Sequence, residues 1–155
     1  MCGLSLRLDG RVALVTGGYG VLGGCLVDGL VAAGARVAVL GRRRDAAEEK
    51  AEAVRQASGE AIALTADVLA EPLIASALDQ LIQAWQRVDI LVNAAGGNVA
   101  RAPSDNSSIF DVSHDAIEEV LRLNMYSCTT SLPVKACSRR GGRLWQIGMS
   151  SCSGY

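Results

Sequence analysis

Short apolar runs alternate along the chain with longer stretches in which apolar residues recur at helical spacing. The runs have the length of buried strands, and we expect strands at Val12–Val15, Val37–Leu40, Ala61–Leu64, Ile90–Val92 and Leu144–Ile147. The stretches between them predict helices at about Val21–Ala33, Asp45–Ala57, Pro72–Gln86 and His114–Thr130. Strands that are apolar throughout, joined by helices, are typical of a parallel sheet covered on both faces. The pattern therefore predicts a doubly wound α/β domain, the Rossmann fold, with about five strands.

Three of the expected helices carry recognisable end signals. Gly34 follows the first helix, where a glycine often closes the last turn. Asp45 and Glu48 are spaced as a capping box at the start of the second helix, and Pro72 stands at the start of the third. These signals support the helices independently of the apolar spacing.

Length and composition limit the number of domains and the classes of partner. The chain has 155 residues, 50% of them hydrophobic, which is enough for a single domain over residues 1–155 and too short for two. A formal net charge of −1 predicts no basic surface for nucleic acid or an anionic membrane. The sequence shows no secretion signal and no apolar run of membrane-spanning length. A cytoplasmic location and a small-molecule partner are expected.

The cysteines and the histidine are not expected to form a metal site or a hydrolytic triad. No C-x-x-C pair occurs, and free thiols are the interpretation for Cys2, Cys25, Cys128, Cys137 and Cys152. The single histidine, His114, follows a plausible helix cap at Ser113 and is interpreted as a solvated residue of the first turn. No metal is predicted.

Five glycines fall in the nine residues TGGYGVLGG, directly after the first expected strand. Gly18, Gly20 and Gly23 match the dinucleotide fingerprint G-x-G-x-x-G between a strand and a helix. In that motif the first glycine permits a tight turn, the second lets the backbone approach a pyrophosphate, and the third lets the helix pack closely against the strand. The loop is interpreted as a phosphate cradle at a helix amino terminus, and a merely tight turn is the alternative.

The end of the second expected strand lacks the acidic residue that commonly accepts the adenosine ribose hydroxyls. The strand ends at Gly41, and three arginines, beginning with Arg42, follow it. Asp45 is near, but the capping box explains it. Because an arginine here accommodates a 2′-phosphate, NADP is slightly favoured over NAD, and a solvated turn of arginines is the alternative.

Four short motifs, in order along the chain, resemble the short-chain dehydrogenase/reductase family. Thr16–Gly23 is similar to the family's cofactor loop, and Asp67-Val68 to the pair after the third strand that contacts adenine. Asn93–Gly96 reads NAAG, another family motif, and Asn124 stands where the family has a helical asparagine that supports a proton-relay water. The sequences of the glycine loop and of the NAAGGN segment are most similar to those of reductases of the D-mannonate/fructuronate type.

The resemblance implies an NAD(P)-dependent oxidoreductase that transfers hydride between nicotinamide and a carbonyl or alcohol carbon, sugar acids included. Together with the end of the second strand, it gives the cofactor-binding residues as Thr16, Gly17, Gly18, Tyr19, Gly20, Val21, Leu22, Gly23, Gly41, Arg42, Asp67, Val68, Asn93, Ala94, Ala95 and Gly96. The catalytic residues that it implies are Asn124 and a serine that hydrogen-bonds the substrate oxygen, Ser150 or Ser151.

The chain departs from the family pattern after these serines. The family's proton donor is the tyrosine of a Tyr-x-x-x-Lys motif well beyond the serine, and no tyrosine here has a lysine at that spacing. Tyr155 lies too close to Ser150 to take this part. The chain therefore looks truncated, and we expect it to bind the dinucleotide without turnover. An exposed fifth strand would also favour association, so a homo-oligomer or association-prone product is expected.

Other interpretations of these residues stay open. The chain could be a non-catalytic dinucleotide-binding or interaction module, or a fragment similar to sugar-nucleotide epimerases, whose loops share the glycine spacing. Asp67 could be only a helix-entry cap, Asn93 only a turn residue, and Asn124 only a helix bend. Ser150 and Ser151 could be a catalytic remnant or part of a tail.

Overall fold

The computed structural model describes residues 7–97, 112–126 and 145–148. In this part of the chain, five parallel strands form one sheet in the order β3-β2-β1-β4-β5. The strands are β1 (Val12–Thr16), β2 (Arg36–Gly41), β3 (Ala61–Thr65), β4 (Ile90–Asn93) and β5 (Trp145–Gly148). All five predicted strands are present within one or two residues of the expected bounds. The doubly wound parallel sheet is therefore confirmed.

The helices also follow the predicted order. They are α1 (Val21–Ala32), α2 (Arg44–Gln56), α3 (Glu71–Trp85) and α4 (His114–Leu121), the last continued by the π-helical segment η2 (Arg122–Tyr126). The helix predicted from His114 to about Thr130 is present over its described part, as α-helix to Leu121 and as π-helix from Arg122 to Tyr126. Its last part, residues 127–130, lies outside the described residues. Among the described helices, none is long and apolar enough to cross a membrane.

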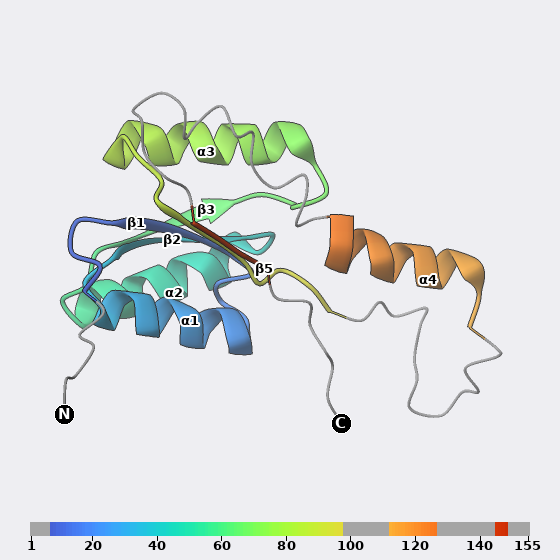
Figure 1. Ribbon diagram of the computed structural model, residues 1–155, viewed down its shortest axis with the longest axis horizontal. Helices are drawn as coiled ribbons and strands as arrows, with labels where there is room; N and C mark the ends of the chain where they lie inside the picture. Colours follow the sequence, from blue (N-terminus) through green and yellow to red (C-terminus); the bar gives the residue numbers. More distant parts are fainter. Residues whose placement is uncertain (1–6, 98–111, 127–144, 149–155) are drawn as a thin grey trace.

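Alternating side chains of the strands fill two separate cores. Val12 and Leu14 point to the face covered by α3, whereas Ala13 and Val15 point to the face covered by α1 and α2. Figure 1 shows α3 on one side of the sheet and α1 and α2 on the other, with α4 standing apart from both layers. Both faces of β1 are buried, which explains why its sequence is apolar without alternation.

The helix ends confirm some of the predicted signals and correct one. Gly34 follows α1 with φ +93°, and Pro72 lies in the first turn of α3. Ser113 caps α4 by accepting a hydrogen bond from the backbone N–H of Ala116 at 3.3 Å. The capping box at Asp45 was wrong, because α2 begins at Arg44 and Asp45 already lies within its first turn. A carboxylate there still faces the positive end of the helix dipole.

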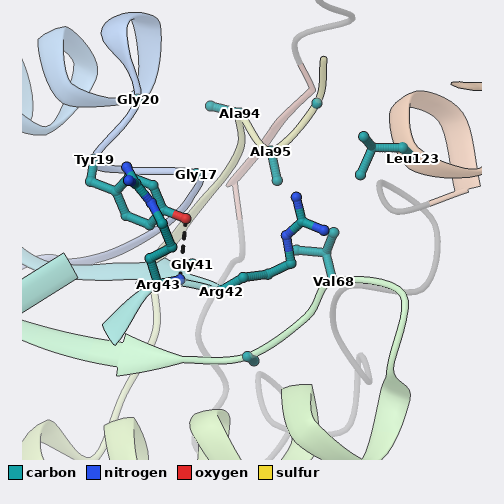
Figure 2. Close-up of a pocket in the computed structure, with 12 residues that line it drawn as sticks. Gly17, Tyr19, Gly20, Gly41, Arg42, Arg43, Val68, Ala94, Ala95 and Leu123 are labelled. Atoms are coloured by element: carbon teal, nitrogen blue, oxygen red, sulfur yellow. Dashed lines mark hydrogen bonds between the residues drawn. The ribbon is translucent and has the colours of Figure 1, made fainter. Parts of the chain in front are cut away.

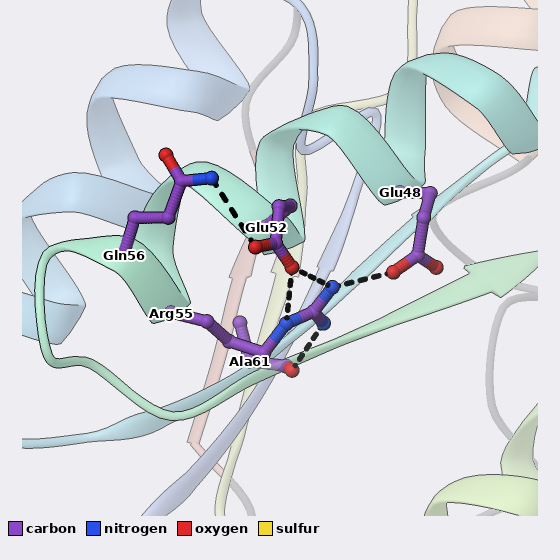
Figure 3. Close-up of polar contacts among 5 residues, drawn as sticks. All are labelled: Glu48, Glu52, Arg55, Gln56 and Ala61. Atoms are coloured by element: carbon purple, nitrogen blue, oxygen red, sulfur yellow. Dashed lines mark hydrogen bonds and ion pairs between the residues drawn. The ribbon is translucent and has the colours of Figure 1, made fainter.

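A cluster of polar side chains ties α2 to the start of β3 (Figure 3). Arg55 donates hydrogen bonds to the Ala61 carbonyl oxygen at 3.0 Å, to Glu52 at 2.7 and 3.0 Å, and to Glu48 at 2.5 Å. The hydrogen bond to Glu48, and then those to Glu52, raise the pKa of Arg55. The cluster joins the second half of α2 to the strand that follows it.

A buried carboxylate, Asp89, joins β1 and β4 at the edge of the sheet where the strands begin. Asp89 Oδ2 accepts the backbone N–H of Val12 at 2.9 Å, and the Asp89 N–H returns a bond to the Val12 carbonyl at 2.8 Å. Arg87 and Arg11 also donate to this carboxylate. Burial raises the pKa of Asp89, but the hydrogen bonds from Arg87, Val12 and Arg11 together outweigh it, and the pKa lies below its ordinary value.

Candidate functional site

The carboxyl ends of the central strands meet at one edge of the sheet. In the strand register Thr16 of β1 lies opposite Leu40 of β2 and Asn93 of β4. The chain leaves β1 toward β2 on one side, whereas β4 lies on the other, so this edge is the topological switch point at which open α/β sheets bind ligands. A pocket of about 560 Å³ opens here. It is lined by Gly17, Tyr19, Gly20, Gly41, Arg42, Arg43, Ala66, Val68, Ala94, Ala95, Gly96 and Leu123.

Gly17 makes the tight turn out of β1. Its φ is +64°, a conformation that side chains rarely adopt, and a Cβ there would lie 2.8 Å from the Ala94 carbonyl oxygen. Its N–H donates to the Leu40 carbonyl oxygen at 2.7 Å, which joins the turn to β2. The sequence predicts that Gly18 permits this turn, and Gly18 lies inside it, because the Gly20 N–H closes the turn on the Gly17 carbonyl oxygen at 2.9 Å. A Cβ at Gly18 would lie 3.0 Å from the Val15 carbonyl oxygen, so Gly18 is needed for close packing, whereas the positive φ belongs to Gly17.

Gly23 allows α1 to approach the loop itself. A Cβ at Gly23 would overlap the Gly17 carbonyl oxygen and lie 3.0 Å from the Cα of Gly18. The expectation that the third glycine brings the helix against the strand is therefore corrected: the close contact is between α1 and the glycine turn. Because of this contact, the first turn of α1 lies against the glycine turn, whose residues Gly17 and Gly20 line the pocket.

The amino terminus of α1 fits a phosphate group. Its N-cap is Gly20, no side chain in the described part of the chain caps it, and no acidic residue lies in its first turn. The first N–H groups of a helix have no intrahelical acceptor, and the helix dipole adds positive potential there. Glycine backbone lining the pocket beside such a terminus is the geometry that binds a pyrophosphate.

Thr16 connects the glycine loop to the NAAG motif. Its Oγ1 accepts hydrogen bonds from the N–H groups of Ala94 and Ala95, both at 3.1 Å. Thr16 and Asn93 are buried, and the pocket is lined by the alanines and not by these two polar residues. Thr16 thus acts on the pocket through the backbone after β4, which it holds in place.

The segment after β3 contributes an apolar wall. Ala66 and Val68 line the pocket, and the Ala66 N–H donates to the Gly41 carbonyl oxygen at 3.1 Å. Asp67, between them, turns its carboxylate to the N–H of Leu69 at 2.9 Å. The alternative that Asp67 caps α3 was wrong, because the N-cap is Ala70.

The end of β2 carries two cations that point in different directions (Figure 2). Arg42 extends along the pocket toward Val68, whereas Arg43 folds back over the ring of Tyr19. The Arg43 guanidinium carbon lies 5.1 Å from the centre of that ring, and the backbone N–H of Arg43 donates to Tyr19 Oη at 3.3 Å. None of the described residues that line the pocket is acidic, so this end of the pocket favours an anion.

Asn124 joins the π-helical segment η2 to the backbone after β4. Its side-chain oxygen accepts the N–H of Gly97 at 3.0 Å, and its amide nitrogen donates to the carbonyl oxygens of Gly97 at 2.9 Å and Val120 at 2.8 Å. The bond to Val120, four residues earlier, accompanies the change from α-helix to π-helix. Asn124 therefore does more than bend the helix, since it also fixes the segment that follows NAAG.

Not all predicted residues meet at the pocket. Those that line it are Gly17, Tyr19, Gly20, Gly41, Arg42, Val68, Ala94, Ala95 and Gly96. Those described residues that lie behind or beside its lining are Thr16, Gly18, Val21, Leu22, Gly23, Asp67, Asn93 and Asn124. The two predicted serines, Ser150 and Ser151, lie outside the described residues.

Three lining residues were missed from the sequence: Arg43, Ala66 and Leu123. Arg43 stood in the arginine run and could have been proposed as a second cation. Ala66 and Leu123 are apolar neighbours of the predicted Asp67 and Asn124, and apolar residues at these positions carry no signal of their own. His114 is exposed in the first turn of α4 and Cys25 is a free thiol, both as predicted.

The comparisons with known proteins agree with this geometry. The family profile described as short chain dehydrogenase matches residues 11–150. This match covers most of the chain, and the chain therefore belongs to the short-chain dehydrogenase family.

Its relatives include oxidoreductases of different substrates. An uncharacterized oxidoreductase, UxuB of Bacillus subtilis (strain 168), is 34% identical over 105 residues, which are 68% of this chain and 38% of that protein. A 7alpha-hydroxysteroid dehydrogenase of Escherichia coli (strain K12) is 32% identical over 123 residues, 79% of this chain and 46% of that protein.

Among solved structures, a candidate D-mannonate oxidoreductase from Haemophilus influenza with bound NAD is similar, with a TM-score of 0.78 and 27% identity. The similarity covers 91% of this chain and 55% of that one. The chain thus spans about half, or less, of the length of these relatives.

Proposed function

We propose that this chain supplies the dinucleotide-binding part of an NAD(P)-dependent oxidoreductase. The observation that carries the proposal is the pocket at the switch point between β1 and β4, where the glycine turn and the uncapped amino terminus of α1 lie together. A pyrophosphate would be held by the backbone of Gly17 and Gly20, and an adenine ring by the apolar wall at Ala66 and Val68.

The chemistry follows from the cofactor that the family uses. A bound nicotinamide would accept or donate a hydride at a carbonyl or alcohol carbon. In this chain, Thr16 holds the N–H groups of Ala94 and Ala95, and Asn124 holds Gly97, the residue after Gly96. The backbone of Ala94–Gly96 lines the pocket together with the end of β2. We propose a small carbonyl or alcohol as substrate. Sugar acids are the first class to test, because the sequence of the glycine loop resembles D-mannonate/fructuronate-type reductases and a candidate D-mannonate oxidoreductase is a similar solved structure.

For the form of the cofactor we propose a preference for NADP. The support is local charge: Arg42 and Arg43 both line the pocket, and Gly41 stands where an acid would bind ribose hydroxyls. A similar solved structure contains NAD, so similarity to that protein does not support NADP, and the proposed preference rests on the residues at the end of β2 alone.

Titration calorimetry of the chain with NADP and NAD tests both parts of the proposal. We expect tighter binding of NADP, and we expect Arg42→Ala to weaken it about tenfold or more while NAD binding changes little, because a charged hydrogen bond is lost. Arg44→Ala is the control, since this exposed residue begins α2 and does not line the pocket. No binding of either nucleotide would refute the proposed function, and equal binding would refute the NADP preference.

The second candidate is a non-catalytic dinucleotide-binding module. It concerns the 155-residue polypeptide alone, in which no tyrosine begins a Tyr-x-x-x-Lys motif. For the 155-residue polypeptide both candidates predict binding without turnover, because no proton donor of the family type is present. We expect no sustained NADPH oxidation in the presence of ketones or keto sugar acids. Sustained oxidation by the purified chain would contradict this.

A further inference from the structure

The ring of Tyr19 fills the place that a side chain at position 41 would take. Gly41 is buried at the last position of β2, and a Cβ there would overlap Tyr19 Cε1 and lie 2.8 Å from Cζ. The atoms that it would meet belong to an aromatic ring, not to the flexible end of a long side chain. Tyr19, in the loop after β1, therefore leaves no room for a side chain at position 41, the last residue of β2.

The same ring also holds a cation. Its hydroxyl oxygen accepts the backbone N–H of Arg43 at 3.3 Å, and the Arg43 guanidinium carbon lies over its face at 5.1 Å from the centre (Figure 2). Because cations are attracted to the face of an aromatic ring, this contact keeps Arg43 at the pocket. The hydroxyl hydrogen of Tyr19 stays available for an acceptor that enters the pocket.

We propose that Tyr19 is a specificity-determining residue for the adenosine end of the cofactor. It excludes an acidic side chain at position 41, which would accept ribose hydroxyls, and it holds Arg43 beside a 2′-phosphate. The inference rests on the proposed function. It assigns the choice between NADP and NAD to a pair of residues, Tyr19 and Gly41, and not to Arg42 alone.

Two nucleotide fragments isolate this end of the site: 2′,5′-ADP carries the 2′-phosphate, and 5′-ADP does not. Their dissociation constants are measured by calorimetry for the wild type and for Tyr19→Phe, Tyr19→Ala, Gly41→Asp and Tyr19→Ala/Gly41→Asp, with folding checked by circular dichroism. The preference is the ratio of the two constants. Neither fragment contains nicotinamide, so the result does not depend on the other end of the site.

We expect Tyr19→Ala to reduce the preference for 2′,5′-ADP about tenfold, and Tyr19→Phe, which keeps the ring, to reduce it less. Gly41→Asp alone is expected to weaken both fragments or to unfold, because the new side chain meets the ring. The double variant removes the ring, and we expect it to fold and to prefer 5′-ADP.

Distinct outcomes separate this inference from the proposed function. If the wild type binds neither fragment and no dinucleotide, the proposed function fails and the inference fails with it. If the wild type binds 2′,5′-ADP and Tyr19→Ala leaves the preference unchanged, the inference alone is wrong. A folded Gly41→Asp single variant with the same reversed preference as the double variant would also overturn it.

Discussion

At the scale of single residues, glycines that look alike in TGGYGVLGG have different roles. Gly17 is required for its backbone conformation, whereas Gly23 is required for a close contact with the turn. A Cβ added at Gly20 would lie 3.2 Å from the Gly17 carbonyl oxygen, and Gly20 lines the pocket. A fingerprint predicts the presence of such a loop, but it does not say which glycine has which role.

Replacing Gly17 with alanine tests this assignment. Gly17→Ala places a Cβ at positive φ and 2.8 Å from the Ala94 carbonyl oxygen, and we expect a loss of at least about 2 kcal/mol in the free energy of unfolding. Urea denaturation measures it. Gly29→Ala is the matched control within α1, where a Cβ meets nothing within 4 Å, and it should stabilise the chain by about 0.5–1 kcal/mol. Equal effects of the two substitutions would contradict the assignment.

At the scale of secondary-structure elements, the end of α2 is closed by a motif that the apolar pattern did not reveal. The N–H of Gly59 bonds to the Val54 carbonyl at 2.9 Å, and the N–H of Ser58 bonds to the Arg55 carbonyl at 3.0 Å. This is a Schellman motif with Ser58 at the left-handed position, φ +66°. Glycine is the residue that usually occupies this position, so Ser58 is a site of local strain.

Ser58→Gly is therefore expected to stabilise the chain by up to about 1 kcal/mol, since glycine adopts positive φ without steric cost. Ala57→Gly is the control at the preceding position, where φ is −82° and glycine adds only conformational freedom to the unfolded chain. Thermal unfolding should show a higher midpoint for the first variant and a lower one for the second. Two midpoints that move in the same direction would refute the explanation from backbone strain.

At the scale of the whole molecule, the two edges of the sheet have separate tasks. The carboxyl edge holds the glycine turn and the pocket, whereas the amino edge is joined by Asp89, which bonds the start of β1. We therefore expect the free energy of unfolding to depend on pH through Asp89, which lies at the end of the strands away from the pocket. The lowered pKa of Asp89 means that its contribution is present above the pKa of about 3.8 in the unfolded chain, and is lost as the pH falls through the folded value.

Asp89→Asn is expected to cost about 1–3 kcal/mol at neutral pH, because hydrogen bonds to a buried carboxylate are lost. Urea denaturation from about pH 7 to about pH 3 measures the free energy of unfolding of both proteins. We expect the difference between wild type and variant to decrease as the pH falls. Asp79→Asn, an exposed residue of α3, is the control. If this difference in the free energy of unfolding stays constant down to about pH 3, the charge of Asp89 is not the source of the stabilisation.

Much of this architecture was predictable because it depends on local patterns. Continuous apolar runs identify buried parallel strands, and Gly34, Pro72 and Ser113 mark helix ends through backbone geometry that neighbouring residues set. The capping box at Asp45 failed because Arg44 already belongs to the helix, and a spacing of residues does not fix where a helix starts.

The sequence by itself determined the class of fold, the order of the elements and the edge of the sheet at which the site lies, since periodicity and strand direction are properties of the chain. Tertiary structure alone decided that Tyr19 covers Gly41, that Arg43 rather than only Arg42 faces the pocket, and that Asn124 holds Gly97. The physical reason is that these contacts join residues from different loops. Their relative positions depend on how strands and helices pack together, which no local pattern encodes.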